Sequence, residues 1–133
     1  MSKKIGLALS GGGARGFAHI GVLKVLAEHN VRIDMIAGTS AGAIVGGAYA
    51  AGMSAEDVVK MASKIGWTNM TRPSLSPLGM LSNAPMGSFI EREFPVNTFE
   101  ALQIPFAAVA CDFESGEEIV LRDSGDLPFA ILY

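Results

Sequence analysis

Residues 31–42 read Val-Arg-Ile-Asp-Met-Ile-Ala-Gly-Thr-Ser-Ala-Gly, and residues 5–16 read Ile-Gly-Leu-Ala-Leu-Ser-Gly-Gly-Gly-Ala-Arg-Gly. In both stretches a short apolar run ends in a glycine-rich turn, and a segment with helical periodicity follows. Apolar runs of this length bounded by glycine are typical of buried strands. We therefore predict strands at 5–9 and 31–37, turns at 10–16 and 38–42, and helices at 17–29 and 43–51. The first helix carries Ala18, Val22, Val25 and Leu26 on one face.

The rest of the chain continues the alternation of strands and helices. Ser54 is a candidate N-cap for a helix that ends near residue 65. Residues 66–84 contain two prolines and several serines, and we interpret them as a loop or lid. Further elements are expected at 85–94 (helix), 99–102 (one turn), 106–111 and 118–121 (strands around a Ser115-Gly116 turn) and from 127 (helix). Such alternation predicts an α/β fold with a mainly parallel sheet.

The size and composition narrow the class of protein. The chain has 133 residues, of which 50% are hydrophobic and 17% charged, so we expect a single domain, or a piece of one, over 1–133 and no disordered tail. The net charge is −3 and no basic block occurs, which excludes the charge pattern of a nucleic-acid-binding protein. Because Cys111 is the one cysteine, an internal disulfide and a cysteine-based zinc site are excluded. We expect Cys111 to be a core thiol.

The longest uncharged stretch, residues 35–53, is as long as a membrane span. Five glycines together with Thr39 and Ser40 interrupt it, so a buried strand, turn and helix explain it better. The apolar run after Lys3 and Lys4 is too short for a signal peptide. The sequence therefore favours a cytoplasmic protein and leaves open a peripheral contact at the inner membrane surface.

Gly38-Thr39-Ser40-Ala41-Gly42 is a G-x-S-x-G motif between a predicted strand and a predicted helix. This is the setting of a nucleophile elbow, in which a sharp turn exposes the serine hydroxyl at the start of a helix. The positive end of the helix dipole favours negative charge at that point. The alternative is a plain glycine turn in which Ser40 only caps the helix.

The other glycine turn, Gly11-Gly12-Gly13-Ala14-Arg15-Gly16, can direct consecutive N–H groups at one anion. One hypothesis is a dinucleotide site, because the spacing fits G-x-G-x-x-G. That site needs an acidic residue at the end of the second strand, whereas Asp34 lies at its start. The other hypothesis is an oxyanion hole. Neighbouring parallel strands bring both turns to one sheet edge, which favours the second hypothesis.

A Ser-His-Asp triad is disfavoured because no histidine follows Ser40, and His19 and His29 both lie in the first predicted helix. We interpret both histidines as packing or surface residues. A serine paired directly with a carboxylate is therefore the preferred mechanism.

The two glycine motifs, with Ala18-His19-Ile20-Gly21-Val22-Leu23 after the first of them, resemble the patatin-like phospholipase family. The resemblance spans essentially the whole chain, and the two motifs together are highly specific. It implies a three-layer α/β/α fold and a Ser–Asp dyad that hydrolyses acyl esters of lipids, with no metal or other cofactor. Lipid or acyl-ester substrates are then the expected partners; the oligomeric state is left open.

The resemblance assigns roles to residues of the two motifs. Ser40 is the implied nucleophile, and N–H groups of Gly11, Gly12 and Gly13 form the oxyanion hole. The motif-supporting residues are Arg15, Gly16, Gly38 and Gly42. The family's catalytic aspartate lies in an Asp-Gly motif, and no Asp-Gly dipeptide occurs in this sequence. We therefore expect that aspartate, and the C-terminal part of the domain, beyond residue 133. The alternative is a catalytically incomplete module that binds lipid or a protein partner.

Overall fold

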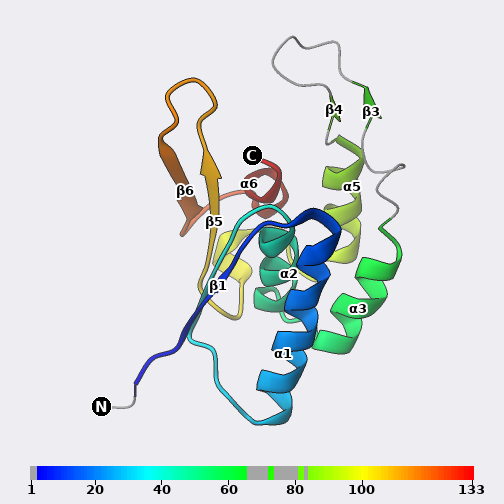
Figure 1. The fold of residues 1–133 in the computed structure, drawn as a ribbon, viewed down its shortest axis with the longest axis vertical. Helices are drawn as coiled ribbons and strands as arrows, with labels where there is room; N and C mark the ends of the chain where they lie inside the picture. The colour runs from blue at the N-terminus through cyan, green and yellow to red at the C-terminus, as the bar shows by residue number, and fades with distance from the viewer. Residues whose placement is uncertain (1–2, 66–71, 74–80, 83) are drawn as a thin grey trace.

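The computed structural model describes residues 3–65, 72–73, 81–82 and 84–133. In the first half of the chain, strands and helices follow one another in the order β1 (Gly6–Leu9), η1 (Gly13–Phe17, a 3-10 helix), α1 (Ala18–Glu28), β2 (Met35–Gly38), α2 (Ala41–Ala50) and α3 (Ala55–Ser63). The second half contains β3 (Arg72–Pro73), β4 (Leu81–Ser82), α5 (Ala84–Glu93), η2 (Phe99–Ala101), β5 (Phe106–Cys111), β6 (Glu118–Arg122) and α6 (Leu127–Leu132). Figure 1 shows these elements.

The main sheet has the order β1-β2-β5-β6. β1, β2 and β5 are parallel, with Leu9 opposite Gly38 and Gly38 opposite Ala108. β6 returns antiparallel to β5 as a hairpin, with Val109 opposite Val120. The predicted α/β class with a mainly parallel sheet is confirmed. The carboxyl ends of β1 and β2 lie side by side, so the two glycine turns leave the sheet at the same edge.

The helices lie on one side of this sheet (Figure 1). The order β1-β2-β5 advances in one direction, and right-handed crossovers in one direction place their helices on the same face. α2 packs directly on the strands: a β-carbon on Gly46 would lie 2.9 Å from the Ile36 side chain and 3.3 Å from the Phe106 ring. The described residues thus contribute two layers of the expected three-layer fold, one of strands and one of helices.

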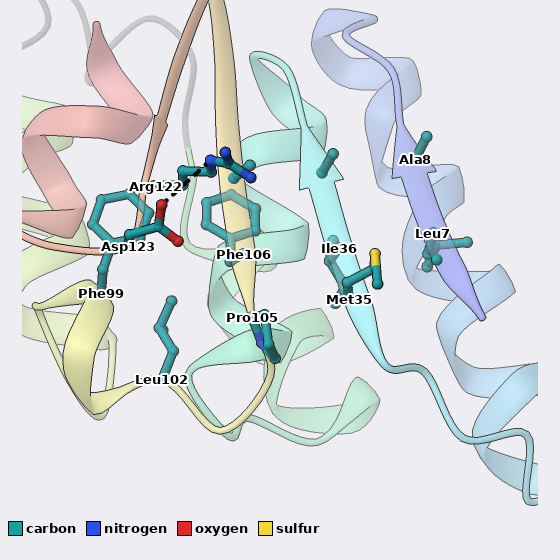
Figure 2. Close-up of a pocket in the computed structure, with 13 residues that line it drawn as sticks. Leu7, Ala8, Met35, Ile36, Phe99, Leu102, Pro105, Phe106, Arg122 and Asp123 are labelled. Carbon is teal, nitrogen blue, oxygen red and sulfur yellow. Dashed lines mark ion pairs between the residues drawn. The ribbon is translucent and has the colours of Figure 1, made fainter. Parts of the chain in front are cut away.

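The opposite face of the sheet has no helix over it among the described residues. Met35 is 46% exposed and Val120 is 45% exposed, although Ile36, the neighbour of Met35, is buried against α2. A cavity of about 620 Å³ runs across residues 6–8 of β1, 35–37 of β2 and 106–107 of β5 and is lined mainly by apolar side chains (Figure 2). The ion pair between Arg122 and Asp123, 3.3 Å long, lies at one end of it. This cavity lies away from the strand ends that lead into the glycine turns.

The helix and strand predictions are confirmed with three differences. Residues 13–17 form a 3-10 helix that continues into α1, so the predicted turn at 10–16 is shorter than expected. The sequence favoured a longer turn because glycine disfavours helix. β2 begins at Met35 rather than residue 31, because the Asp34 carboxylate accepts a bond from the Ile5 N–H and fixes the start of the pairing at this point. α1 buries Ile20 and Leu23, whereas Val22 and Val25 are about half exposed, so most of the apolar face seen in the sequence is not the face that packs on the core; Leu26 of that face is partly buried.

Three further predictions concern two single stretches and the cysteine. Residues 35–53 form β2, the turn and α2 rather than one span, and no helix within the described ranges is long and apolar enough to cross a membrane. The predicted loop or lid at 66–84 lies mostly outside the described residues; β3 and β4 within it pair antiparallel. Cys111 is exposed at the end of β5, so its assignment to the core was wrong. It lies where the hairpin leaves the sheet.

Candidate active site

Ser40 occupies a strained turn between β2 and α2. Its backbone has φ 51° and ψ −121°, a conformation that residues other than glycine rarely adopt. It stands at the N-cap position of α2, and its carbonyl accepts from the N–H groups of Ala43 and Ile44. However, its side chain makes no capping hydrogen bond. The hydroxyl is exposed and free of partners among the described residues, which argues against the interpretation of Ser40 as a simple helix cap.

The glycines on both sides of Ser40 are required by close backbone contacts. A β-carbon on Gly38 would overlap the Gly42 carbonyl oxygen, and one on Gly42 would overlap the Leu9 carbonyl oxygen. The end of β1 therefore packs directly on the first turn of α2. This contact brings the loop that follows β1 to the serine.

The glycine loop, residues 10–16, lies against the serine turn. A β-carbon on Gly16 would overlap that of Ala41, and one on Gly11 would lie 3.3 Å from the Cβ of Ser40. Within the described part of the chain, the N–H groups of Gly11 and Gly12 donate no hydrogen bond. Gly13 has φ 54° and starts the 3-10 helix. Unpaired N–H groups in a loop that packs against the serine turn are expected of an oxyanion hole.

A pocket of about 290 Å³ opens beside Ser40. Its walls come from α2, β5, α5 and α6, and they are almost entirely apolar: Ala43, Ile44, Met86, Ala108, Val109, Ala110, Ala130, Ile131, Leu132 and Tyr133. In the sequence, the Met and Leu residues of 70–86 are a candidate acyl-chain entrance, with ordinary packing under a long loop as the alternative. Met86 from this set lines the pocket, whereas residues 130–133 gave no such signal. Among the described residues, no charged side chain lines the pocket, so it suits an apolar chain better than a charged group.

The two histidines hold backbone carbonyls. His19 Nε2 lies 2.8 Å from the Ser10 carbonyl oxygen, and His29 Nδ1 lies 2.9 Å from that of Val25. Both agree with the prediction that neither histidine belongs to a triad. Arg15 is exposed on η1, and its N–H donates to the Gly12 carbonyl.

All five aspartates are described, and each stabilises a local structure rather than facing Ser40. Asp34 binds the Ile5 N–H at the start of β1, which leaves it far from the glycine loop that a dinucleotide would use. Asp57 pairs with Lys60 on α3, and Asp123 pairs with Arg122. Asp126 caps α6 by accepting from the Phe129 N–H.

Asp112 closes the turn of the β5–β6 hairpin. Its Oδ1 accepts from the Ser115 N–H at 2.7 Å, the Ser115 hydroxyl at 2.9 Å and the Glu114 N–H at 3.0 Å. The hydrogen bonds from Ser115 hold the pKa of Asp112 below its ordinary value, so this carboxyl is a poor proton acceptor. No aspartate lines the Ser40 pocket, and no three His, Cys, Asp or Glu side chains gather into a metal site within the described ranges.

The comparisons with known proteins agree with this geometry. The family model described as patatin-like phospholipase matches residues 7–131. The chain belongs to the patatin-like phospholipase family. It is a family of lipid hydrolases that act on lipid ester substrates.

Relatives of this patatin-like chain are much longer. An uncharacterized NTE family protein of Mycobacterium bovis is 37% identical over 121 residues, which cover 89% of this chain and 33% of that protein. A protein of Eremothecium gossypii named as a lysophospholipase is 63% identical over 46 residues, 35% of this chain and 3% of that protein. The chain thus spans about a third of the length of its mycobacterial relative.

A solved structure shows the same fold. The type III effector protein ExoU superimposes with a TM-score of 0.70 over 98% of this chain and 39% of its own chain, at 19% identity. At this identity the likeness concerns the fold alone. It confirms the patatin-like α/β arrangement that the two glycine motifs predict.

Proposed function

We propose that this chain carries the nucleophile and the oxyanion hole of a serine acyl-ester hydrolase, acting on phospholipids, lysophospholipids or simple carboxylic esters. The observation that carries the proposal is the uncapped Ser40 hydroxyl. It stands in a strained turn at the start of α2, against Gly11, whose N–H group, like that of the following Gly12, donates no hydrogen bond among the described residues. Strain of this kind costs about 1–3 kcal/mol and is found where a side chain must be held for chemistry.

The reaction proceeds in two steps on these groups. The Ser40 Oγ attacks the acyl carbonyl carbon, and the carbonyl oxygen becomes an oxyanion held by N–H groups of Gly11, Gly12 and Gly13. Collapse of this intermediate expels the alcohol and leaves an acyl-serine. Water then attacks the acyl-serine and releases the carboxylic acid. The apolar pocket beside Ser40 takes the acyl chain.

Both steps need a general base, because a serine hydroxyl at its free pKa contains almost no alkoxide. Each aspartate of these 133 residues is committed to a cap, a turn or an ion pair, and none lines the pocket. We propose that the base is an aspartate outside residues 1–133, so the Ser–Asp dyad is completed by another part of the protein. In this account residues 1–133 form part of one patatin-like domain.

The proposal includes the location of the protein in the cell. We propose that it is a cytoplasmic protein that contacts the inner membrane surface, where it would meet its lipid substrates. Fractionation of cells into soluble and membrane fractions, at low and high salt, tests this. Recovery only from an external fraction would contradict it.

The alternative is a patatin-like module that binds lipid or a protein partner without hydrolysing it, and the absence of a carboxylate from the pocket favours this view. Hydrolysis of lysophospholipid and p-nitrophenyl esters by the protein expressed from its complete gene separates the two. The hydrolase account predicts turnover that Ser40→Ala abolishes and that residues 1–133 alone do not support. Lipid binding without turnover in the complete protein would establish the alternative.

A further inference from the structure

The histidine at the start of α1 contacts the first residue of the glycine loop. His19 Nε2 lies 2.8 Å from the Ser10 carbonyl oxygen, nine residues away in the sequence. Because a carbonyl oxygen only accepts, Nε2 carries the proton and donates it. We propose that His19 is a positioning residue that holds the Ser10–Gly11 peptide in the orientation needed for the oxyanion hole. This inference rests on the proposed acyl-ester hydrolysis.

The geometry of the peptide unit connects this bond to the site. The peptide is planar and trans, so its C=O and N–H point in opposite directions. A bond that draws the Ser10 carbonyl toward α1 therefore directs the Gly11 N–H away from α1. Gly11 is also the loop residue whose Cα lies against the Ser40 side chain, and its N–H donates to no acceptor among the described residues.

The loop needs such a restraint because its backbone has few others. Gly11, Gly12 and Gly13 follow one another, and glycine turns readily between backbone conformations. Gly13 has φ 54° and a β-carbon there would meet no atom within 4 Å, so neighbouring side chains do not restrain it. Among the described residues, the Ser10 carbonyl oxygen packs close to Gly42 and accepts one hydrogen bond, which comes from His19. Without that bond, the Ser10–Gly11 peptide loses its directional restraint and can turn its N–H away from the acyl oxygen.

The same contact excludes a different role for this atom. A general base must accept a proton from Ser40, but His19 Nε2 already donates to a carbonyl. The neutral ring with its proton on Nε2 is sufficient for this bond. The inference therefore predicts that any side chain able to donate at this place can replace the imidazole.

The test compares His19→Ala, His19→Gln and His29→Ala in the protein expressed from its complete gene. His29 is the matched control, because it lies near the other end of α1 and also contacts a backbone carbonyl. Loss of one oxyanion-hole donor costs about 100- to 1,000-fold in kcat, so a loosened donor in His19→Ala is expected to cost at least about tenfold. KM is expected to stay within about twofold, since the acyl pocket is untouched. His19→Gln, whose amide can donate to Ser10, recovers most of kcat, and His29→Ala keeps all of it.

Three results would overturn the inference: kcat of His19→Ala equal to that of the unaltered protein, equal losses in His19→Ala and His19→Gln, or an equal loss in His29→Ala. A readout independent of turnover is the Gly11 amide signal in an NMR spectrum. It is expected to be sharp in the unaltered protein and His19→Gln, and exchange-broadened in His19→Ala. An unchanged signal in His19→Ala contradicts the inference even if no ester is hydrolysed. Absence of turnover in the unaltered protein, by contrast, counts against the proposed function.

Discussion

Gly11 lies so close to Ser40 that a β-carbon on Gly11 would be 3.3 Å from the Cβ and 4.0 Å from the Oγ of the serine. The two residues are 29 positions apart, and they meet because β1 and β2 are adjacent and parallel and end at the same sheet edge. Each turn alone is a common glycine turn. Their contact brings the glycine loop, in which the N–H groups of Gly11 and Gly12 donate to no described residue, against the turn that carries the exposed Ser40 hydroxyl, and the proposed chemistry depends on this.

The packing of β1 on α2 predicts opposite effects for two glycine-to-alanine substitutions. Gly42→Ala would overlap the Leu9 and Ser10 carbonyl oxygens, so we expect it to unfold the chain or lower its stability by at least about 3 kcal/mol. Gly21→Ala, on an exposed face of α1 with no atom within 4 Å, should raise stability by up to about 1 kcal/mol through helix propensity. Urea denaturation measures both. Equal stabilities of the two variants would contradict the close packing of Gly42 on the end of β1.

The strained backbone of Ser40 predicts that holding the serine in its turn lowers the stability of the folded chain. Ser40→Gly removes the strain at φ 51°, at the cost of glycine's greater freedom in the unfolded chain. We expect Ser40→Gly to be about 1 kcal/mol more stable than Ser40→Ala, which retains the strained backbone with a β-carbon. Thermal denaturation of the pair measures the difference. A less stable Ser40→Gly would indicate an unstrained turn.

The wall of the Ser40 pocket predicts a residue that limits acyl-chain length. Met86 on α5 is 5% exposed and lines the pocket, so Met86→Ala enlarges it. The ratio of hydrolysis rates for dodecanoyl and butanoyl p-nitrophenyl esters should rise by about 3- to 10-fold. Met61→Ala is the control, since Met61 is 1% exposed on α3 and does not line the pocket. A similar change of ratio in both variants would mean that general loosening, not pocket size, sets the preference.

The contact between Lys64 and Glu93 predicts a pH-dependent contribution to stability. Lys64 Nζ donates to Glu93 Oε2 at 2.7 Å, and this bond lowers the pKa of Glu93 from its ordinary value of 4.5. The stabilisation is therefore complete above that value and is lost as the pH falls through the lowered pKa. Glu93→Gln should cost up to about 1 kcal/mol at pH 7, since Lys64 is largely exposed, and progressively less as the pH falls through the lowered pKa. A difference that persists unchanged at pH 3 would contradict the assignment.

Much of the fold and the motif geometry could be predicted from local signals. Glycine turns after short apolar runs located β1, β2 and the start of α2, and the side chains of Ser54 and Asp126 cap the helices that follow them. Each of these signals depends on a few adjacent residues and on backbone geometry. They can therefore be recognised in the sequence without knowledge of the tertiary contacts.

The errors arose where tertiary contacts decide. α1 has apolar residues on more than one face, and the positions of the sheet and α3, not the periodicity, select Ile20 and Leu23 for burial. The pocket wall joins Met86 to α6 across a long sequence separation, which no local pattern records. The exposure of Cys111 likewise depends on where the hairpin leaves the sheet.

The claim that Ser40 is an activated nucleophile is tested most directly by intact-mass spectrometry after treatment with an alkyl fluorophosphonate. The protein is expressed from its complete gene, with Ser40→Ala as the control. The account predicts one phosphonyl adduct on the unaltered protein, mapped to the peptide that contains Ser40, and none on Ser40→Ala. An adduct of equal yield on Ser40→Ala, or no adduct on a folded unaltered protein, would contradict it.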